Sequence, residues 1–114
     1  MDEKILKWLV DINEAIEEIE SYFSHTAKDF NNYKSNTILK RAVERDLEII
    51  GEAVNRILHR DPNIKIENAR QIVALRNQII HAYDNISDEN IWAILIKHLP
   101  ILKREISELL KDID

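Results

Sequence analysis

Apolar residues return every three or four positions along most of this chain, and that spacing constrains its fold more than any other feature. In the first stretch, from Lys4 to about Ser24, they fall at Ile5, Leu9, Ile12, Ile16, Ile19 and Phe23. This pattern places them on one side of an α-helix. Sheets need turns rich in glycine and proline, and the sequence has one glycine and two prolines. We therefore expect an all-α protein.

A polar connector, residues 25–36, separates this helix from a second one over about Thr37–Leu58. Asn36 or Thr37 is the expected N-cap. Its apolar stripe consists of Leu39, Val43, Leu47, Ile50, Val54 and Ile57. Gly51 lies inside this helix, where a glycine costs about 1 kcal/mol relative to alanine. The expected compensation is close approach by another helix, either in the same chain or across a dimer.

Three shorter helical segments are expected in the second half of the chain. The first starts at Glu67 or Asn68, and its core stripe is Ile72, Leu75, Ile79 and Ala82. After a polar break at residues 84–87, Ser87 is the expected N-cap of a short fourth helix. Pro100 suits the first turn of a fifth. The pattern as a whole predicts a compact up-and-down bundle of about five helices.

The chain of 114 residues is long enough for one core but not for two, so we expect a single domain over residues 1–114. It has no cysteine, which excludes disulfides and thiolate metal sites. Its first residues lack the layout of a signal peptide, and no apolar run approaches the length of a membrane span. These features predict a soluble, cytoplasmic protein.

The charge is unevenly distributed. The formal net charge is -5, which argues against a broad basic surface for nucleic acid. Residues 1–35 sum to -4, whereas residues 56–81 carry five basic and two acidic residues and sum to +3. This one basic segment either leads into a binding site or is a solvated helix face.

The basic segment ends in Arg-Asn-Gln-Ile-Ile-His-Ala-Tyr, residues 76–83, which holds the candidate site residues Arg76, Asn77, His81 and Tyr83. At about 100° per residue, Arg76 and Tyr83 are about 20° apart on a helix, whereas His81 points about 140° away from Arg76. One straight helix cannot bring Arg76 and His81 to the same small group. Either the helix loosens at residues 80–81, or a second copy of the chain completes the site.

The chemistry of this stretch suits RNA cleavage. Imidazole can take a proton from a ribose 2′-hydroxyl or give one to the leaving 5′-oxygen, and guanidinium stabilises charge on phosphorus. Neither step needs a metal. The same residues also have ordinary structural explanations. Arg76 suits a surface salt bridge, His81 suits a helix C-terminus, and Tyr83 suits a partly buried aromatic position.

The stretch at residues 76–83 resembles the signature of the HEPN superfamily in its HepT-like branch. Four residues separate Arg76 from His81, and one residue separates His81 from Tyr83. The block at residues 41–53, Arg-Ala-Val-Glu-Arg-Asp-Leu-Glu-Ile-Ile-Gly-Glu-Ala, resembles the second-helix block of that branch. Trp92 and the Leu-Pro-Ile-Leu-Lys of residues 99–103 resemble its tail. The resemblance covers about residues 38–110.

This resemblance implies an all-α homodimer in which the motifs of both subunits face a shared cleft. It implies a metal-independent endoribonuclease without a cofactor, the toxin of a type VII-like toxin–antitoxin pair. The implied partner is an MntA-like minimal nucleotidyltransferase, which silences the toxin by transferring AMP to Tyr83. In this scheme Arg76 binds phosphate, His81 is the acid and base, and Asn77 assists. Residues 63–68 lack the Pro-Trp of relatives, which leaves partner contacts at that loop open.

Two other classes of function are compatible with an acidic helical protein. The first is a non-enzymatic dimer acting as a nucleotide- or nucleotidyltransferase-binding subunit, which burial of Arg76 or His81 in a salt bridge would favour. The second is a di-metal four-helix bundle, suggested by Glu44, Glu48, Glu52 and four histidines. Such bundles need Glu-x-x-His, and the residues three before the later histidines are Arg56, Gln78 and Leu95. The glutamates are more simply a charged helix flank.

Overall fold

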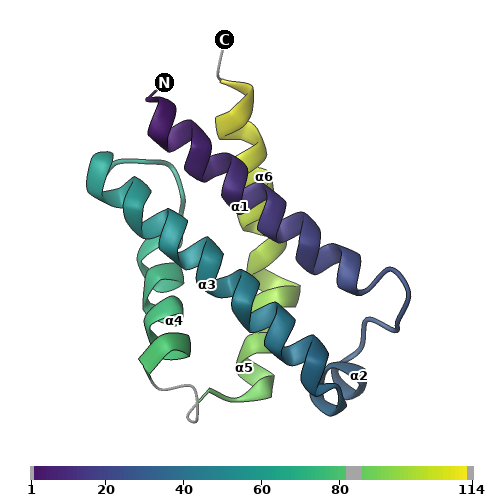
Figure 1. Cartoon of the computed structure of the whole chain (residues 1–114). Helices are drawn as coiled ribbons and strands as arrows, with labels where there is room; N and C mark the ends of the chain where they lie inside the picture. Colours follow the sequence, from purple (N-terminus) through teal and green to yellow (C-terminus); the bar gives the residue numbers. More distant parts are fainter. Residues whose placement is uncertain (1, 82–85, 113–114) are drawn as a thin grey trace.

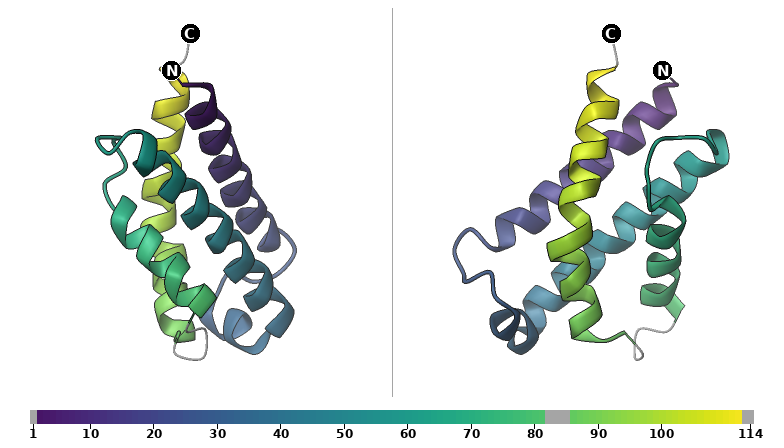
Figure 2. Two further views of the ribbon diagram at one scale, coloured as in Figure 1. Left: turned by 60° about the vertical axis from the view of Figure 1, so that its left-hand side comes forward. Right: turned by 180° about the vertical axis from the view of Figure 1, so that it is seen from behind.

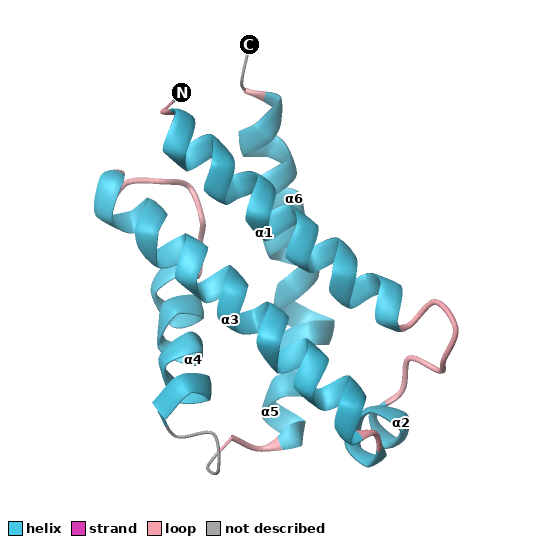
Figure 3. Cartoon of the chain, viewed as in Figure 1, coloured by secondary structure: helices cyan, strands magenta, loops and turns pink. Residues whose placement is uncertain are grey.

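The computed structural model describes residues 2–81 and 86–112, and within these ranges α-helices and one π-helical turn form all the regular secondary structure (Figure 3). The elements are α1 (Glu3–Tyr22), α2 (Phe30–Ser35), α3 (Thr37–Arg60), α4 (Ala69–His81), α5 (Asp88–Ala93), the π-helical turn Ile94–His98 and α6 (Leu99–Lys111). The expected all-α bundle is confirmed. No helix in the described ranges is both long and apolar enough to cross a membrane.

The helices α1 and α3 lie side by side and form the centre of the fold (Figure 1). They run antiparallel, and an ion pair between Arg60 and Asp2 joins the end of α3 to the start of α1. Both predicted apolar stripes are buried, except that Phe23 at the end of the first is half-exposed. Asn36 caps α3 as expected, since its side chain accepts a hydrogen bond of 3.0 Å from the backbone N–H of Leu39.

The prediction of a polar connector over residues 25–36 is wrong, because this segment contains α2. The Tyr33 side chain is buried, and its ring centroid lies 5.6 Å from that of Trp92. The rings of Phe23 and Phe30 lie 5.9 and 6.3 Å from the same indole. Trp92 of α5, far along the chain, therefore supplies part of the apolar surface against which α2 packs. The local sequence gives no periodic pattern of its own.

The predicted fourth and fifth helices form one continuous rod instead of two separate helices (Figure 2). Ser87 caps its start as expected, with its hydroxyl oxygen 3.1 Å from the N–H of Asn90. Pro100 has no N–H and its ring clashes with the carbonyl four residues earlier in a regular α-helix. The chain widens into a π-turn here, in which the N–H of Leu99 donates to the carbonyl of Ile94. The π-helical turn thus accommodates Pro100, and the helix continues instead of breaking there.

Within residues 2–81 and 86–112, one charged side chain is buried in the core. Asp46 of α3 is 1% exposed, and its carboxylate oxygen lies 2.6 Å from the Tyr22 hydroxyl, which also lies 2.7 Å from the Glu18 carboxylate. A phenol carries one proton and donates to one carboxylate at a time. Burial raises the pKa of the Asp46 carboxyl, although its hydrogen bond with Tyr22 opposes that shift.

Gly51 allows α4 to approach α3 closely. A Cβ atom at this position would overlap the Cβ of Arg76, and would lie 2.9 Å from its Cγ and 3.3 Å from the carbonyl oxygen of Ile72. The predicted close approach is therefore confirmed, within the chain. Only Ala69 and Ile79 of α4 are buried. The other stripe positions at 72 and 75 are half-exposed, and residue 82 lies outside the described ranges.

Candidate functional site

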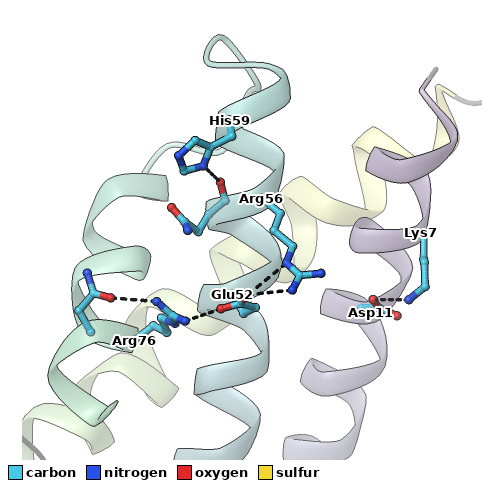
Figure 4. A network of polar contacts seen from close by, with 8 residues as sticks. Lys7, Asp11, Glu52, Arg56, His59 and Arg76 are labelled. Carbon is cyan, nitrogen blue, oxygen red and sulfur yellow. Dashed lines mark hydrogen bonds and ion pairs between the residues drawn. The ribbon is translucent and has the colours of Figure 1, made fainter. Parts of the chain in front are cut away.

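Arg76 is held against α3 by a polar network (Figure 4). Its side chain is 24% exposed, and its Nη2 donates to the Glu52 carboxylate at 2.5 Å. Its Nη1 donates to the side-chain oxygen of Asn77 at 3.1 Å. Its Nε is buried and has no hydrogen-bond partner in the described part of the chain. The guanidinium is therefore fixed in place, and Gly51 is what brings it to this position.

Glu52 is shared by two arginines. Its other carboxylate oxygen lies 3.1 Å from both Nε and Nη2 of Arg56, so one negative charge lies between two positive ones. Figure 4 shows the carboxylate between the two guanidinium groups. The three side chains together retain one positive charge. The four-residue spacing of Glu44, Glu48 and Glu52 predicts only a charged helix flank and does not reveal this pairing. The available signals were its position beside Gly51 and its spacing of four residues from Arg56.

The network borders a surface groove of about 310 Å³ between α1, α3 and α4. Its lining consists of Trp8, Asp11, Arg45, Glu48, Ile49, Glu52, Ala53, Arg56, Arg76 and Ile80. Two apolar residues of this lining, Ile49 and Ile80, are 37% and 38% exposed. We call this the Arg76 groove. It combines apolar surface with charges of both signs.

His81 lies on a different face of α4 from Arg76. The helix continues to His81 in α-helical form, so the first of the two alternatives, loosening at residues 80–81, does not occur. In a regular helix, the two side chains point about 140° apart. His81 and Asn77 are both exposed. The structure thus brings Arg76 and Asn77 together and leaves His81 apart from Arg76, while Tyr83 lies outside the described residues.

The carboxylates that suggested a di-metal bundle are largely committed to arginines. Glu44 forms an ion pair of 3.1 Å with Arg41, and Glu52 holds Arg56 and Arg76. Across the residues that the structure describes, no three histidine, aspartate or glutamate side chains gather in a way that could hold a metal ion. The carboxylates around Arg76 orient guanidinium groups.

Comparison with known proteins gives one family and a consistent set of relatives. The profile of a family described as "Ribonuclease HepT-like" matches residues 12–109. A Methanocaldococcus jannaschii protein named "Putative RNase MJ1380" is 34% identical over 101 residues, which are 87% of this chain and 90% of the relative. A Thermococcus cleftensis protein named "Probable ribonuclease HepT" is 32% identical over 105 residues, covering 91% and 94%. The comparison with solved structures finds no match.

Proposed function

The chain belongs to the HepT-like ribonuclease family, and from this premise we propose that it is a metal-independent endoribonuclease toxin of a type VII-like toxin–antitoxin pair. Arg76, Asn77 and His81 carry the cleavage, and Tyr83 is the site at which an antitoxin silences it. The family match supports the reaction class. The exposure of His81 and the polar network around Arg76 support these residue roles.

The proposed reaction is transfer of the phosphoryl group within the RNA strand. The 2′-oxygen attacks the adjacent phosphorus while imidazole accepts its proton. The bond to the 5′-oxygen breaks as the protonated imidazole gives this proton to that oxygen. His81, exposed at the end of α4, supplies the imidazole. Arg76 stabilises the negative charge that develops on the phosphoryl oxygens. The products are a 2′,3′-cyclic phosphate and a free 5′-hydroxyl, and no metal takes part.

The observation that carries this proposal is the regular helix between Arg76 and His81. Because one chain directs these side chains to different faces, a site that uses both needs two chains. We propose a symmetric dimer in which Arg76 of one subunit and the partner subunit's His81 meet at a shared cleft. The Arg76 groove supports such a contact. Its exposed Ile49 and Ile80 offer an apolar centre, and its charges of both signs suit pairing with a second copy.

The proposed control of this activity is AMP transfer to Tyr83 by an MntA-like nucleotidyltransferase. Tyr83 is two residues beyond His81 and seven beyond Arg76 in the sequence. An adenylyl group on its hydroxyl adds bulk and a negative phosphate. That phosphate would compete with the substrate for the positive charge that the Arg56–Glu52–Arg76 network retains.

The test is RNA cleavage by purified protein in EDTA, after intact-mass measurement has excluded added AMP. We expect cleavage by the wild type and its loss in His81→Ala and Arg76→Ala. The matched controls are His98→Ala and Arg104→Ala, which change exposed residues outside the Arg76 groove and leave cleavage unchanged. Loss of activity in the wild type on addition of EDTA, or full activity in His81→Ala, would contradict the proposal.

A second candidate is a non-enzymatic dimer that binds a nucleotide or a nucleotidyltransferase. The observation that favours it is the Arg76–Glu52 ion pair, because a largely buried and paired guanidinium has fewer donors left for a phosphate. Absence of cleavage by unmodified wild-type protein on several RNAs would favour this candidate. Nucleotide binding, or binding of the nucleotidyltransferase, that depends on Arg76 would then establish it.

A further inference from the structure

A second groove, of about 400 Å³, lies between the C-terminal half of α3 and α4. It is lined by Asn55, Leu58, His59, Pro62, Arg70, Val73, Ala74 and Asn77. We call it the His59 groove. Apolar side chains, two amides, an imidazole and a guanidinium all border the same hollow. That mixture is typical of small-ligand sites, which are mostly apolar and have a few polar groups that fix orientation.

The imidazole of His59 is held in a defined orientation. Its Nδ1–H donates to the main-chain carbonyl of Asn55 at 2.8 Å, one turn earlier in α3 (Figure 4). The ring nitrogen that faces a carbonyl must carry the hydrogen, so Nε2 remains for other contacts. The imidazole and the Pro62 ring border the groove together. A flat aromatic ring such as imidazole provides a stacking surface for unpaired bases, and the apolar Pro62 ring adds a van der Waals contact beside it.

Arg70 supplies the positive charge of this groove. It is exposed and forms no ion pair with any side chain in the part of the chain that the structure describes. Its guanidinium therefore keeps its donors available to an anion. Arg76 differs in this respect, since it is paired with Glu52 and largely buried. For a phosphate arriving from solvent, Arg70 is the more accessible of the two arginines.

Arg70 also lies on the face of α4 that carries His81. Eleven residues separate them, which on a regular helix is about 20° of rotation and about 16 Å of rise. Asn77 lies between them on the same face and lines the groove. Its side-chain oxygen accepts a hydrogen bond from Arg76, so its amide N–H groups remain available as donors. One face of α4 therefore presents guanidinium, amide and imidazole in a row.

We propose that the His59 groove is a binding subsite for a nucleotide of single-stranded RNA that flanks the bond cut at His81. Arg70 binds a phosphate of that nucleotide, and the base lies against His59 and Pro62. The strand then follows α4 along Arg70, Asn77 and His81. This inference rests on the proposed RNA-cleaving function. It adds a binding role for two residues, Arg70 and His59, that take no part in the chemical step.

The test is the binding of a fluorescein-labelled single-stranded RNA hexamer to the His81→Ala protein, which serves as the parent because the RNA then stays intact. Adding Arg70→Gln is expected to weaken binding about tenfold at low salt and to reduce the slope of log K against log salt concentration by about 0.7, the loss of one single-strand phosphate contact. Adding His59→Ala is expected to weaken binding about fivefold or more, as loss of a stacking partner does.

The matched control is Arg104→Gln in the same parent, which removes the same charge from an exposed position on α6 outside the groove. It is expected to leave affinity and salt slope unchanged, and thermal unfolding checks that both arginine variants fold. The inference is overturned if Arg70→Gln behaves like Arg104→Gln, or if the parent binds no RNA. Because this assay measures binding alone, it can succeed where the cleavage assay fails, and it can fail where cleavage is observed.

Discussion

The helices α1 and α4 both pack against α3, but they do so in different ways. In α1, the side facing the bundle is apolar and buried, and its buried residues are Ile5, Leu9, Ile12, Ala15, Ile16 and Ile19. In α4, only Ala69 and Ile79 are buried, and contact with α3 runs through Arg76, Glu52 and the space left by Gly51. Helix α1 is held against α3 by buried apolar surface, whereas α4 is held by close backbone approach and a polar network.

The two contacts therefore differ in how much they contribute to stability and in how much they contribute to the candidate site. Burial of apolar side chains is the dominant favourable term in folding, so the contact between α1 and α3 supports the whole molecule. A partly buried ion pair adds little stability because desolvation offsets the attraction between its charges. The pairing of Arg76 with Glu52 is therefore better explained by its effect on orientation. The helix with fewer buried contacts is the one that presents the candidate site.

The largest expected effect on stability comes from the α1 core. Leu9 is fully buried, and Leu9→Ala is expected to lower the free energy of unfolding by about 3 kcal/mol through lost burial and the cavity left behind. The matched control is Val10→Ala, the next residue of the same helix, which is 39% exposed. Its expected cost is below about 1 kcal/mol. Urea unfolding monitored by circular dichroism measures both, and equal costs would refute the assignment of α1 as the scaffold.

The contact between α3 and α4 is tested by adding one methyl group. Gly51→Ala places a Cβ against Arg76 and is expected to destabilise the protein by about 2 kcal/mol, despite the higher helix propensity of alanine. In an Arg76→Gly background the obstructing Cβ is gone and only the 3.3 Å contact with the Ile72 carbonyl oxygen remains, so the same substitution is expected to cost less than about 1 kcal/mol. A double-mutant cycle in urea measures this coupling. Additive effects of the two substitutions would contradict the close approach.

Burial of the Asp46 carboxyl predicts that the free energy of unfolding depends on pH. Burial raises the pKa of Asp46 above its ordinary value of 3.8, so the folded state holds a proton that the unfolded state releases. The stability that this proton contributes is complete below pH 3.8 and is lost as the pH rises through the raised pKa. Asp46→Asn removes this loss. At pH 8 we expect the variant to be more stable than the wild type by on the order of 1 kcal/mol.

Urea unfolding of both proteins from pH 4 to pH 8 measures the difference in stability. The control is Asp11→Asn, since the Asp11 side chain is 34% exposed and forms an ion pair with Lys7 on the surface of α1. A stability difference between the wild type and Asp46→Asn that is constant across the range would show that Asp46 keeps its ordinary pKa in the folded state.

The smallest expected effect on folding is at the rim of the Arg76 groove. Ile80 is 38% exposed, and Ile80→Ser is expected to change the free energy of unfolding of one chain by less than about 0.5 kcal/mol. If the groove is the proposed dimer contact, the same substitution weakens self-association. Sedimentation equilibrium measures this, with Ile38→Ser as the control on an exposed residue outside the groove. If Ile80→Ser and Ile38→Ser associate equally strongly, the Arg76 groove is not the dimer contact.

The sequence predicted the parts of the fold that depend on local periodicity. The α1 and α3 stripes, the Asn36 and Ser87 caps and the role of Gly51 follow from spacing and helix propensity. The helix α2 was missed because Phe30 and Tyr33 pack against Trp92, a contact over a long sequence separation. The π-turn before Pro100 was missed for a different reason, since it is an adjustment of backbone hydrogen bonds that leaves no pattern in the sequence.

The candidate site was predicted in part. The spacing of Arg76 and His81 predicts that one straight helix cannot bring the two side chains together. It does not distinguish a loosened helix from a site completed by a second chain. The structure shows the helix intact up to His81. The pairing of Arg76 with Glu52 joins residues 24 positions apart, and only the packing of α4 on α3 reveals it.

If the cleavage site is shared between two chains, two variants that are inactive alone restore activity when they are mixed. Arg76→Ala and His81→Ala are refolded together at equal concentration, with each refolded alone as the control. Half of the dimers then contain one subunit of each kind, and each such dimer has one intact site. We predict recovery of about one quarter of wild-type RNA cleavage. No recovery from a mixture in which mixed dimers are shown to form would contradict the account.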